Sequence, residues 1–232
     1  MQHFFLASNE GLVFGLVIVA ILAFAYILYY FSNKSRILRG LRKSKAIPIH
    51  RAQNGSYVKL VGKAKHAGQP LTAPLSGRKC IYYEVLVERK GDKSWHTMIN
   101  DKKYQDFFLE VNGEMAMIKA ELSTSERRVY LEKDHRQDSG FMNDPSAKLD
   151  NYLELHGKTS TGILGFNKKI RYREGIIELD EVIAVKGIAQ WKSISEPIEG
   201  YSYSKILALS GTAKQKLLIT DSKEATTPNQ ET

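Results

Sequence analysis

Hydrophobic residues are concentrated near the start of the chain. Residues 11–31 contain no charged side chain. At about 1.5 Å of rise per residue, a helix of this length extends about 30 Å, which matches the hydrocarbon core of a bilayer. A helix that is apolar on every face is typical of a membrane span rather than of a soluble core. The pattern predicts a transmembrane helix over 11–32, preceded by a short extracytoplasmic N-terminus over 1–10.

The two flanks of this segment differ in charge. The first ten residues contain only Glu10, whereas residues 33–51 contain seven basic residues and no acidic one. Positive charge stays on the cytoplasmic side of a membrane. We therefore expect a single-pass protein of the cell inner (plasma) membrane, with its N-terminus outside and its C-terminal domain in the cytoplasm. A cleaved signal peptide is disfavoured, because it requires a basic start, a shorter apolar region and a small-residue cleavage site.

Residues 33–56 are interpreted as a basic juxtamembrane connector. We expect the helix to continue through Arg42, and Pro48 forbids further helix. Orienting the span is the simplest role of the basic residues. Attraction to anionic headgroups, worth about 1 kcal/mol per residue near the surface, is a second prediction. The residues predicted to contact anionic lipid are Lys34, Arg36, Arg39, Arg42, Lys43 and Lys45.

Alternating apolar and polar positions dominate the rest of the chain and predict strands. Asn112-Gly113 lies between two apolar runs and predicts a type I′ hairpin. Helical spacing of apolar residues predicts a short helix over 148–156. Segment 132–148 is polar and is predicted to be an exposed insertion. The remaining strand candidates are 57–62, 79–89, 95–99, 129–131, 170–179 (interrupted by a turn), 181–191, and a last pair formed by 205–209 and 215–221.

The pattern apolar-x-apolar-x-Gly-x-Ala occurs three times, with glycines at 62, 187 and 211. Glycine inside a strand marks a bulge or a close backbone approach. We therefore expect three strands that bend at equivalent places. The predicted fold is mainly β (a β-rich α+β domain built as a curved antiparallel sheet or small barrel) over 57–221, with one N-terminal transmembrane helix. Residues 222–232 are predicted to be a disordered tail.

Composition and motifs disfavour most enzyme classes. The net charge of +9 is concentrated beside the apolar segment, which argues against nucleic-acid binding by the domain. The single Cys80 excludes an intrachain disulfide and a zinc site with several thiolates. A small buried hydrophobe is a better interpretation of Cys80 than a reactive nucleophile. Gly157-Lys-Thr159 lacks the upstream glycine of a phosphate-binding loop. We predict no catalytic residues, no cofactor and no metal site.

Residues 71–83, Leu-Thr-Ala-Pro-Leu-Ser-Gly-Arg-Lys-Cys-Ile-Tyr-Tyr, resemble a known family. They are similar to the loop and aromatic strand of the beside-a-membrane (GIDE-type) domain of the Mulan/GIDE mitochondrial ubiquitin ligases and their prokaryotic relatives. The resemblance covers roughly 57–222 and implies a domain next to a membrane, in a chain of bacterial or archaeal origin. Further matching segments follow in the expected order, at Trp95, 107–113, 171–174, 185–187 and 218–221.

The resemblance does not extend to ligase chemistry. Ubiquitin transfer in the family resides in a RING domain with several Cys and His zinc ligands, and one cysteine cannot supply them. The eukaryotic proteins also have a second membrane span after the domain, whereas residues 192–232 contain no apolar run of that length. A ubiquitin-transferase activity inherited with the family name is therefore the disfavoured alternative, and we expect no RING and a single span.

The sequence thus predicts a non-catalytic binding, adaptor or sensor module held at the membrane. Its expected partners are the anionic bilayer surface and a protein in or beside the membrane. In a second hypothesis the chain is an accessory subunit of a larger membrane complex and docks through its transmembrane helix, where Gly11 and Gly15 form a close-packing motif. The candidate partner or ligand surface in the domain consists of Pro70, Leu71, Pro74, Ser76 and Arg78.

Overall fold

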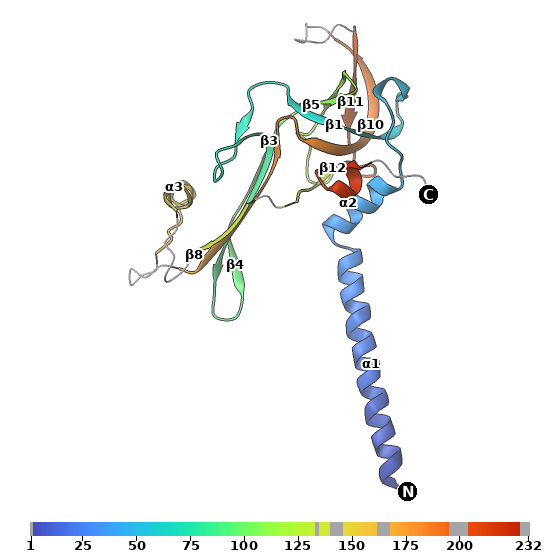
Figure 1. Ribbon diagram of the computed structural model, residues 1–232, viewed down its shortest axis with the longest axis vertical. Coiled ribbons are helices and arrows are strands. Elements are labelled where there is room, and N and C mark those ends of the chain that lie inside the picture. Colours follow the sequence, from blue (N-terminus) through green and yellow to red (C-terminus); the bar gives the residue numbers. More distant parts are fainter. Residues whose placement is uncertain (1, 133–134, 140–145, 162–167, 195–203, 228–232) are drawn as a thin grey trace.

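The computed structural model describes residues 2–132, 135–139, 146–161, 168–194 and 204–227. A long helix, α1 (Gln2–Tyr30), projects from a β-rich domain, and a shorter helix, α2 (Asn33–Arg42), joins the two (Figure 1). The predicted class, mainly β with one apolar N-terminal helix, is confirmed. The remaining helical segments are η1 (Ile49–Arg51), α3 (Ala147–Leu155) and α4 (Lys223–Thr226).

The strands form two sheets. Within the described residues they are β1 (Tyr57–His66), β2 (Leu71–Thr72), β3 (Lys79–Lys90), β4 (Trp95–Tyr104), β5 (Phe107–Val111), β6 (Glu114–Ile118), β7 (Arg127–Tyr130), β8 (His135–Ser139), β9 (Ile170–Glu178), β10 (Val182–Ser193), β11 (Lys205–Ser210) and β12 (Leu217–Thr220).

The first sheet closes on itself as a small barrel. Its strands follow the order β1-β5-β6-β11-β10, and β10 pairs back with β1 in antiparallel register. β12 and then β7 extend this sheet beyond β10. The β11–β6 and β12–β7 pairs are parallel, and the other pairs of this sheet are antiparallel. Fully buried side chains such as Leu60, Phe107 and Leu109 fill the interior. Closure gives each of the five barrel strands a partner on both sides, so none of them is an open edge.

The three repeated glycines lie where barrel backbones approach closely. A Cβ at Gly62 would collide with the backbone oxygen of Glu110 on β5. At Gly187 it would lie 2.8 Å from a backbone oxygen of β11, and at Gly211 it would collide with the backbone of Glu126 and Leu217. Such separations leave no room for a side chain. The prediction that these glycines mark close backbone approaches is confirmed.

The second sheet forms an arm beside the barrel (Figure 1). Its order is β2-β3-β9-β8, with β4 paired to β3 as a long hairpin. The predicted turn within 170–179 is wrong, because β9 is one continuous strand whose Gly175 pairs with Glu84 on β3. Helix α3, predicted from its spacing, covers one face of the arm. It contributes Leu149, Tyr152 and Leu153 to a core shared with β3 and β9.

Several local predictions are confirmed or corrected. The hairpin turn has positive φ angles at Asn112 (52°) and Gly113 (83°), as a type I′ turn requires. β11 and β12 do not pair with each other, because each pairs with β10. The start of the predicted tail is ordered, since α4 buries Ala225 against α2. Within the predicted 132–148 insertion, β8 pairs with β9. Residues 133–134 and 140–145, the loop at 162–167 and the end of the tail at 228–232 lie outside the described residues.

Candidate membrane interface and binding surfaces

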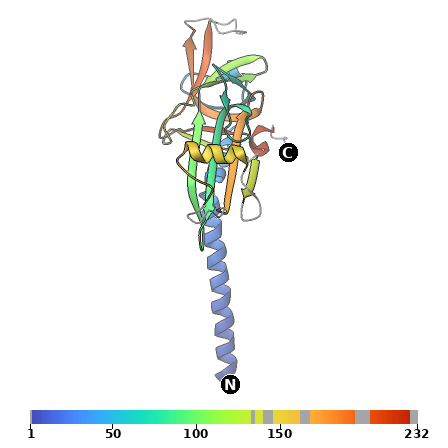
Figure 2. The ribbon, with the colours of Figure 1, turned by 90° about the vertical axis from the view of Figure 1, so that its left-hand side faces the viewer.

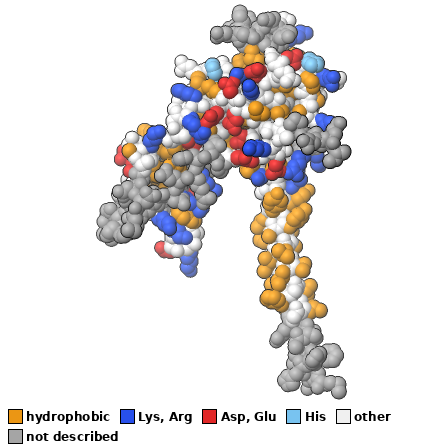
Figure 3. Space-filling view, in the orientation of Figure 1, with side chains coloured by type: hydrophobic (Ala, Val, Ile, Leu, Met, Phe, Trp, Pro, Cys, Tyr) orange, Lys and Arg blue, Asp and Glu red, His pale blue; other side chains and the backbone are white. Residues whose placement is uncertain are grey.

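Helix α1 presents an apolar surface over its described side chains, residues 11–30 (Figure 3). Residues Gly11–Tyr30 form a segment of 20 residues with a mean hydropathy of 2.8, and none of it is buried against the domain. By length and composition this helix suffices to cross a bilayer. Tyr26, Tyr29 and Tyr30 lie at its domain-proximal end, where the amphipathic rings of a spanning helix meet the headgroups.

A sharp junction separates α1 from α2. The predicted continuous helix is interrupted at Phe31-Ser32, and the Ser32 hydroxyl caps α2 by accepting a hydrogen bond from the Ser35 amide at 3.2 Å. Two arginines of α2 then fold back over aromatic rings at the junction, Tyr30 at the end of α1 and Phe31 just after it. The Arg39 guanidinium lies 3.6 Å from the centroid of the Tyr30 ring, and Arg36 lies 5.3 Å from that of Phe31. These cation–π contacts tie the two helices together.

The opposite face of α2 is part of the domain core. Ile37, Leu38 and Leu41 are buried against Ala184 of β10 and Leu218 of β12. The predicted connector is therefore not a flexible linker over its helical part, because it packs into the fold. Each fully buried aliphatic side chain contributes roughly 1.5–3 kcal/mol relative to exposure.

A buried lysine fixes the end of α2. The Lys186 ammonium donates a hydrogen bond of 3.0 Å to the carbonyl oxygen of Gly40, near the C-terminus of α2 where carbonyls lack helical partners. Lys186 lies opposite Lys59 in the β1–β10 pair, and both are buried. Burial lowers the pKa of each, and their mutual repulsion contributes at Lys59. No local sequence signal indicated this role of Lys186, because its partner lies 146 positions away.

The six basic residues predicted to contact lipid remain on the surface around α2. Arg36, Arg42, Lys43 and Lys45 are exposed, and Lys34 and Arg39 are half-buried. Among their protein contacts, Arg42 forms an ion pair with Glu224 of α4, and the Lys34 ammonium lies 5.3 Å from the centroid of the Tyr130 ring. Their placement is compatible with headgroup contact, which stays a prediction.

The loop predicted as a partner surface is held by a buried carboxylate. Glu174 on β9 is fully buried and accepts hydrogen bonds from the amides of Leu75 and Ser76, each at 2.9 Å. Leu75 is buried in the core of the arm, and Gly77 has a φ of 77°, a conformation that favours glycine. The sequence pattern around Glu174 could have indicated that its side chain is buried. Glu174 lies on the buried face of β9, in alternation with Ile170, Tyr172 and Ile176.

The surface of this loop is only partly accessible. Each of the five candidate residues is half-buried, and Arg78 forms an ion pair with Glu178 at the end of β9. The structure therefore brings the candidate residues together as one anchored loop. The candidates are Pro70, Leu71, Pro74, Ser76 and Arg78.

Two further sites contain side chains that could take part in chemistry. The first is Cys80. Its side chain is fully buried beside Ala73 and Ile176. Burial, reinforced by the nearby Glu174 carboxylate, raises the pKa of the Cys80 thiol to about 11. The thiolate, which is the nucleophilic form, is therefore scarce at neutral pH, and Cys80 serves as a small core side chain.

The second site is a Tyr–Asp cluster between α3 and β4. Asp101 accepts hydrogen bonds from the hydroxyls of Tyr152, at 2.9 Å, and Tyr83, at 3.3 Å. Burial and the Asp101 carboxylate raise the pKa of Tyr83 to about 12 and raise that of Tyr152 as well. Both hydroxyls are protonated donors at neutral pH, so the cluster fixes α3 to the sheet.

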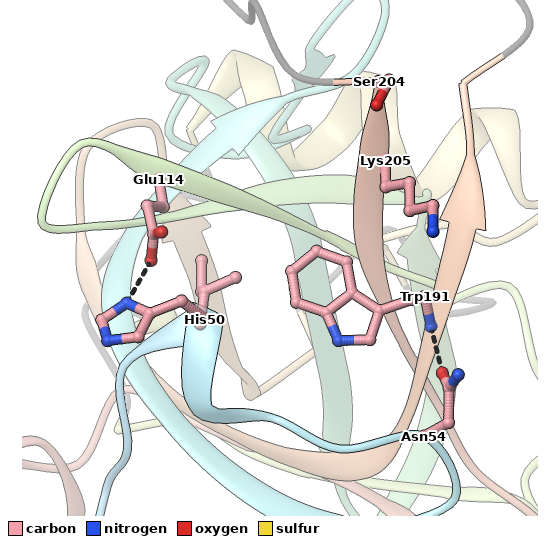
Figure 4. A pocket seen from close by; sticks show the side chains of 7 residues that line it. His50, Asn54, Glu114, Trp191, Ser204 and Lys205 are labelled. Atoms are coloured by element: carbon pink, nitrogen blue, oxygen red, sulfur yellow. Dashed lines mark hydrogen bonds and ion pairs between the residues drawn. The ribbon is translucent and has the colours of Figure 1, made fainter.

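A cleft of about 500 Å³ lies between η1, β6, β10 and the start of β11 (Figure 4). The Trp191 ring forms one wall and is held in place by a 2.8 Å hydrogen bond from its Nε1 to the carbonyl oxygen of Ala52. On the other side, His50 Nδ1 lies 3.3 Å from a carboxylate oxygen of Glu114. This lining suits a ligand with an apolar body and polar ends. Sequence reasoning missed this cleft. Its lining residues are Ile49, His50, Asn54, Glu114, Trp191, Ser204 and Lys205.

Fold and surface together define a small closed β-barrel with a side arm, carried on an apolar helix that is long enough to cross a bilayer. Comparison with known family models, with curated proteins and with solved structures gives no match. Among the described residues, no group of three or more His, Cys, Asp or Glu side chains is arranged to hold a metal ion.

Proposed function

We propose that this chain is a single-pass membrane protein whose β-domain is a non-catalytic binding module, an adaptor or sensor, held against the cytoplasmic face of the inner membrane. The observation that carries the proposal is the double role of α2. One face of this helix is part of the domain core, while Arg39 packs on Tyr30 at the end of α1 and Arg36 on Phe31 of the junction.

A rigid junction of this kind favours a function at the membrane surface. A flexible linker would let the domain sample a large volume. Here, two residues separate α1 from α2, and α2 is packed into the domain. The domain would therefore present defined surfaces at a defined height above the bilayer. The family resemblance of residues 57–222 points the same way.

The membrane assignment is tested with the full-length protein in native membranes. We expect the chain to resist alkaline carbonate extraction and to retain its N-terminal residues by intact mass, because a span is not cleaved. A cysteine-reactive reagent that does not cross membranes should label Ser8→Cys from outside, and label the exposed Gln53→Cys only after lysis. Loss of residues 1–32 from the mature protein would refute the proposal in favour of a signal sequence.

The binding role is tested by crosslinking in the membrane, followed by purification in mild detergent. We expect a stoichiometric companion that is lost from the double variant Pro74→Ala with Arg78→Gln. The matched control is Arg51→Gln, an exposed arginine at the end of η1. Equal recovery with both variants would exclude the 70–78 loop as the partner surface.

The alternative, an accessory subunit that docks through α1, predicts a different dependence. No atom lies within 4 Å of a Cβ built at Gly11 or Gly15, so both glycines are free to contact another helix. Replacing Gly15 with Leu would then abolish companion recovery, whereas the loop variant would not. In our main proposal the two variants have the opposite effects.

A further inference from the structure

The β3–β4 hairpin of the arm extends along the same side of the domain as α1. Figure 1 shows its tip lower than the α1–α2 junction, beside the domain-proximal turns of α1, and Figure 2 shows the same relation in height from a perpendicular direction. The tip therefore extends past the domain-proximal end of α1, toward the side on which a bilayer crossed by α1 would lie. If α1 crosses a bilayer, the tip meets the surface of that bilayer.

The composition of the tip fits this depth. Lys90 ends β3 and Trp95 begins β4, so both belong to the tip. Segment 89–96 contains three basic residues, Arg89, Lys90 and Lys93, and a single acidic one, Asp92. The three basic residues are exposed. Basic side chains beside a tryptophan are typical of protein surfaces that contact anionic headgroups.

Two cationic side chains lie close to the Trp95 ring. The Lys90 ammonium lies 5.6 Å from the centroid of the Trp95 ring, and the Arg171 guanidinium lies 4.2 Å from it. The nearest carboxylate on β3, Glu88, is engaged by Arg171 at 2.7 Å and by Arg173 at 3.2 Å. The acidic group next to the tip is thus neutralised within the protein, and the surplus charge of the tip is positive.

We infer that the tip of the β3–β4 hairpin, residues 89–96, is a second membrane contact that binds anionic lipid headgroups of the bilayer that α1 crosses. The inference rests on the proposed membrane span. With α1 and the hairpin tip as two separate supports, the domain is fixed against rotation about α1.

An ordinary solvated hairpin is the competing explanation, since charged side chains also protect exposed edge strands from association. That explanation accounts for the lysines on the hairpin, but not for the position of the hairpin tip below the α1–α2 junction. It predicts that the tip stays in water whatever the lipid composition. The two accounts therefore differ in a measurable quantity, the proximity of the tip to headgroups.

The test uses the full-length protein in lipid nanodiscs with a fluorophore on one introduced cysteine. Ser94→Cys reports on the exposed tip, Phe31→Cys on the end of α1, and Gln53→Cys on the far end of the barrel. Cys80 is fully buried, so the unsubstituted protein controls for background labelling. The quencher is a phospholipid with a nitroxide on its headgroup, in neutral phosphatidylcholine with or without anionic phosphatidylglycerol.

In anionic nanodiscs we expect quenching at Ser94→Cys within about twofold of that at Phe31→Cys and several times that at Gln53→Cys. Each lysine near an anionic surface strengthens contact by a factor of about five. Adding Lys90→Gln and Lys93→Gln should therefore weaken the contact equilibrium roughly thirtyfold. The matched control neutralises Lys63 and Lys214, two exposed lysines of the barrel, and should change nothing.

Three results would overturn the inference. Quenching at Ser94→Cys no greater than at Gln53→Cys would place the tip in water. Equal quenching in neutral and anionic bilayers, or no effect of the Lys90 and Lys93 substitutions, would remove the charge attraction on which it depends. Loss of quenching at Phe31→Cys would refute the membrane span itself, and so distinguishes failure of the proposed function from failure of this inference.

Discussion

The contact between Glu174 and the 74–77 loop leads to the most specific prediction. Replacing Glu174 with Gln keeps the size of the side chain but leaves one amide oxygen to serve two backbone donors. The amides of Leu75 and Ser76 now each donate to a separate carboxylate oxygen, both at 2.9 Å. In the variant, the NH₂ group faces one of these N–H groups. One buried donor is therefore left without an acceptor.

The expected cost follows from these two bonds. Hydrogen bonds to charged groups contribute about 1.5–3 kcal/mol, and a buried donor left unpaired costs about 1–3 kcal/mol. Removing a buried charge offsets part of this loss. We expect a net destabilisation of roughly 1–3 kcal/mol. At about 2–4 °C per kcal/mol for a domain of this size, the melting temperature falls by roughly 2–12 °C.

Two measurements check the prediction in detergent-solubilised full-length protein. Thermal unfolding followed by circular dichroism gives the melting temperature, with Glu154→Gln on the exposed face of α3 as the matched control. Hydrogen exchange is the sharper assay, because the Leu75 and Ser76 amides should lose protection about tenfold or more while the β5–β6 hairpin is unchanged. Unchanged exchange at these two amides would show that Glu174 does not hold the loop.

The remaining predictions concern packing, reactivity and pH. Gly62→Ala should destabilise by about 1–3 kcal/mol or more, because its Cβ meets backbone that cannot move aside; Gly175→Ala, whose nearest atom is 3.4 Å away, is the control, and equal melting temperatures would contradict the close-approach argument. Cys80 should react with a thiol reagent only on unfolding, because burial raises its pKa to about 11; rapid labelling of the native protein would disprove this. The hydrogen bond from Arg171 lowers the pKa of Glu88 below 4.5, so the pair stabilises the fold above that pH and the contribution is lost as pH falls through the folded pKa. Glu88→Gln should therefore lower the melting temperature at pH 7, and this difference should shrink as the pH falls below 4.5; a difference that does not change with pH would refute the assignment.

The sequence predicted features whose causes are local. The apolar run over 11–31 specifies its helix by composition alone. Asn112-Gly113 specifies its turn because both residues tolerate positive φ. Alternation and glycine placement predicted a curved β-domain, because both depend on residues next to each other in the chain. The buried Glu174 was not among these predictions, because a turn was expected within 170–179 where β9 is continuous.

Tertiary structure alone decided how these elements pair. Closure of the barrel joins Tyr57 to Ile188, and no local pattern encodes a register between strands so far apart. The same holds for α2, whose basic residues suggested a connector but whose buried face is completed by β10, β12 and α4. It holds also for Glu174, which gains its role only when β9 lies beside the 74–77 loop. The physical reason is that the cost or benefit of burying a group depends on what covers it, and only the assembled fold supplies that cover.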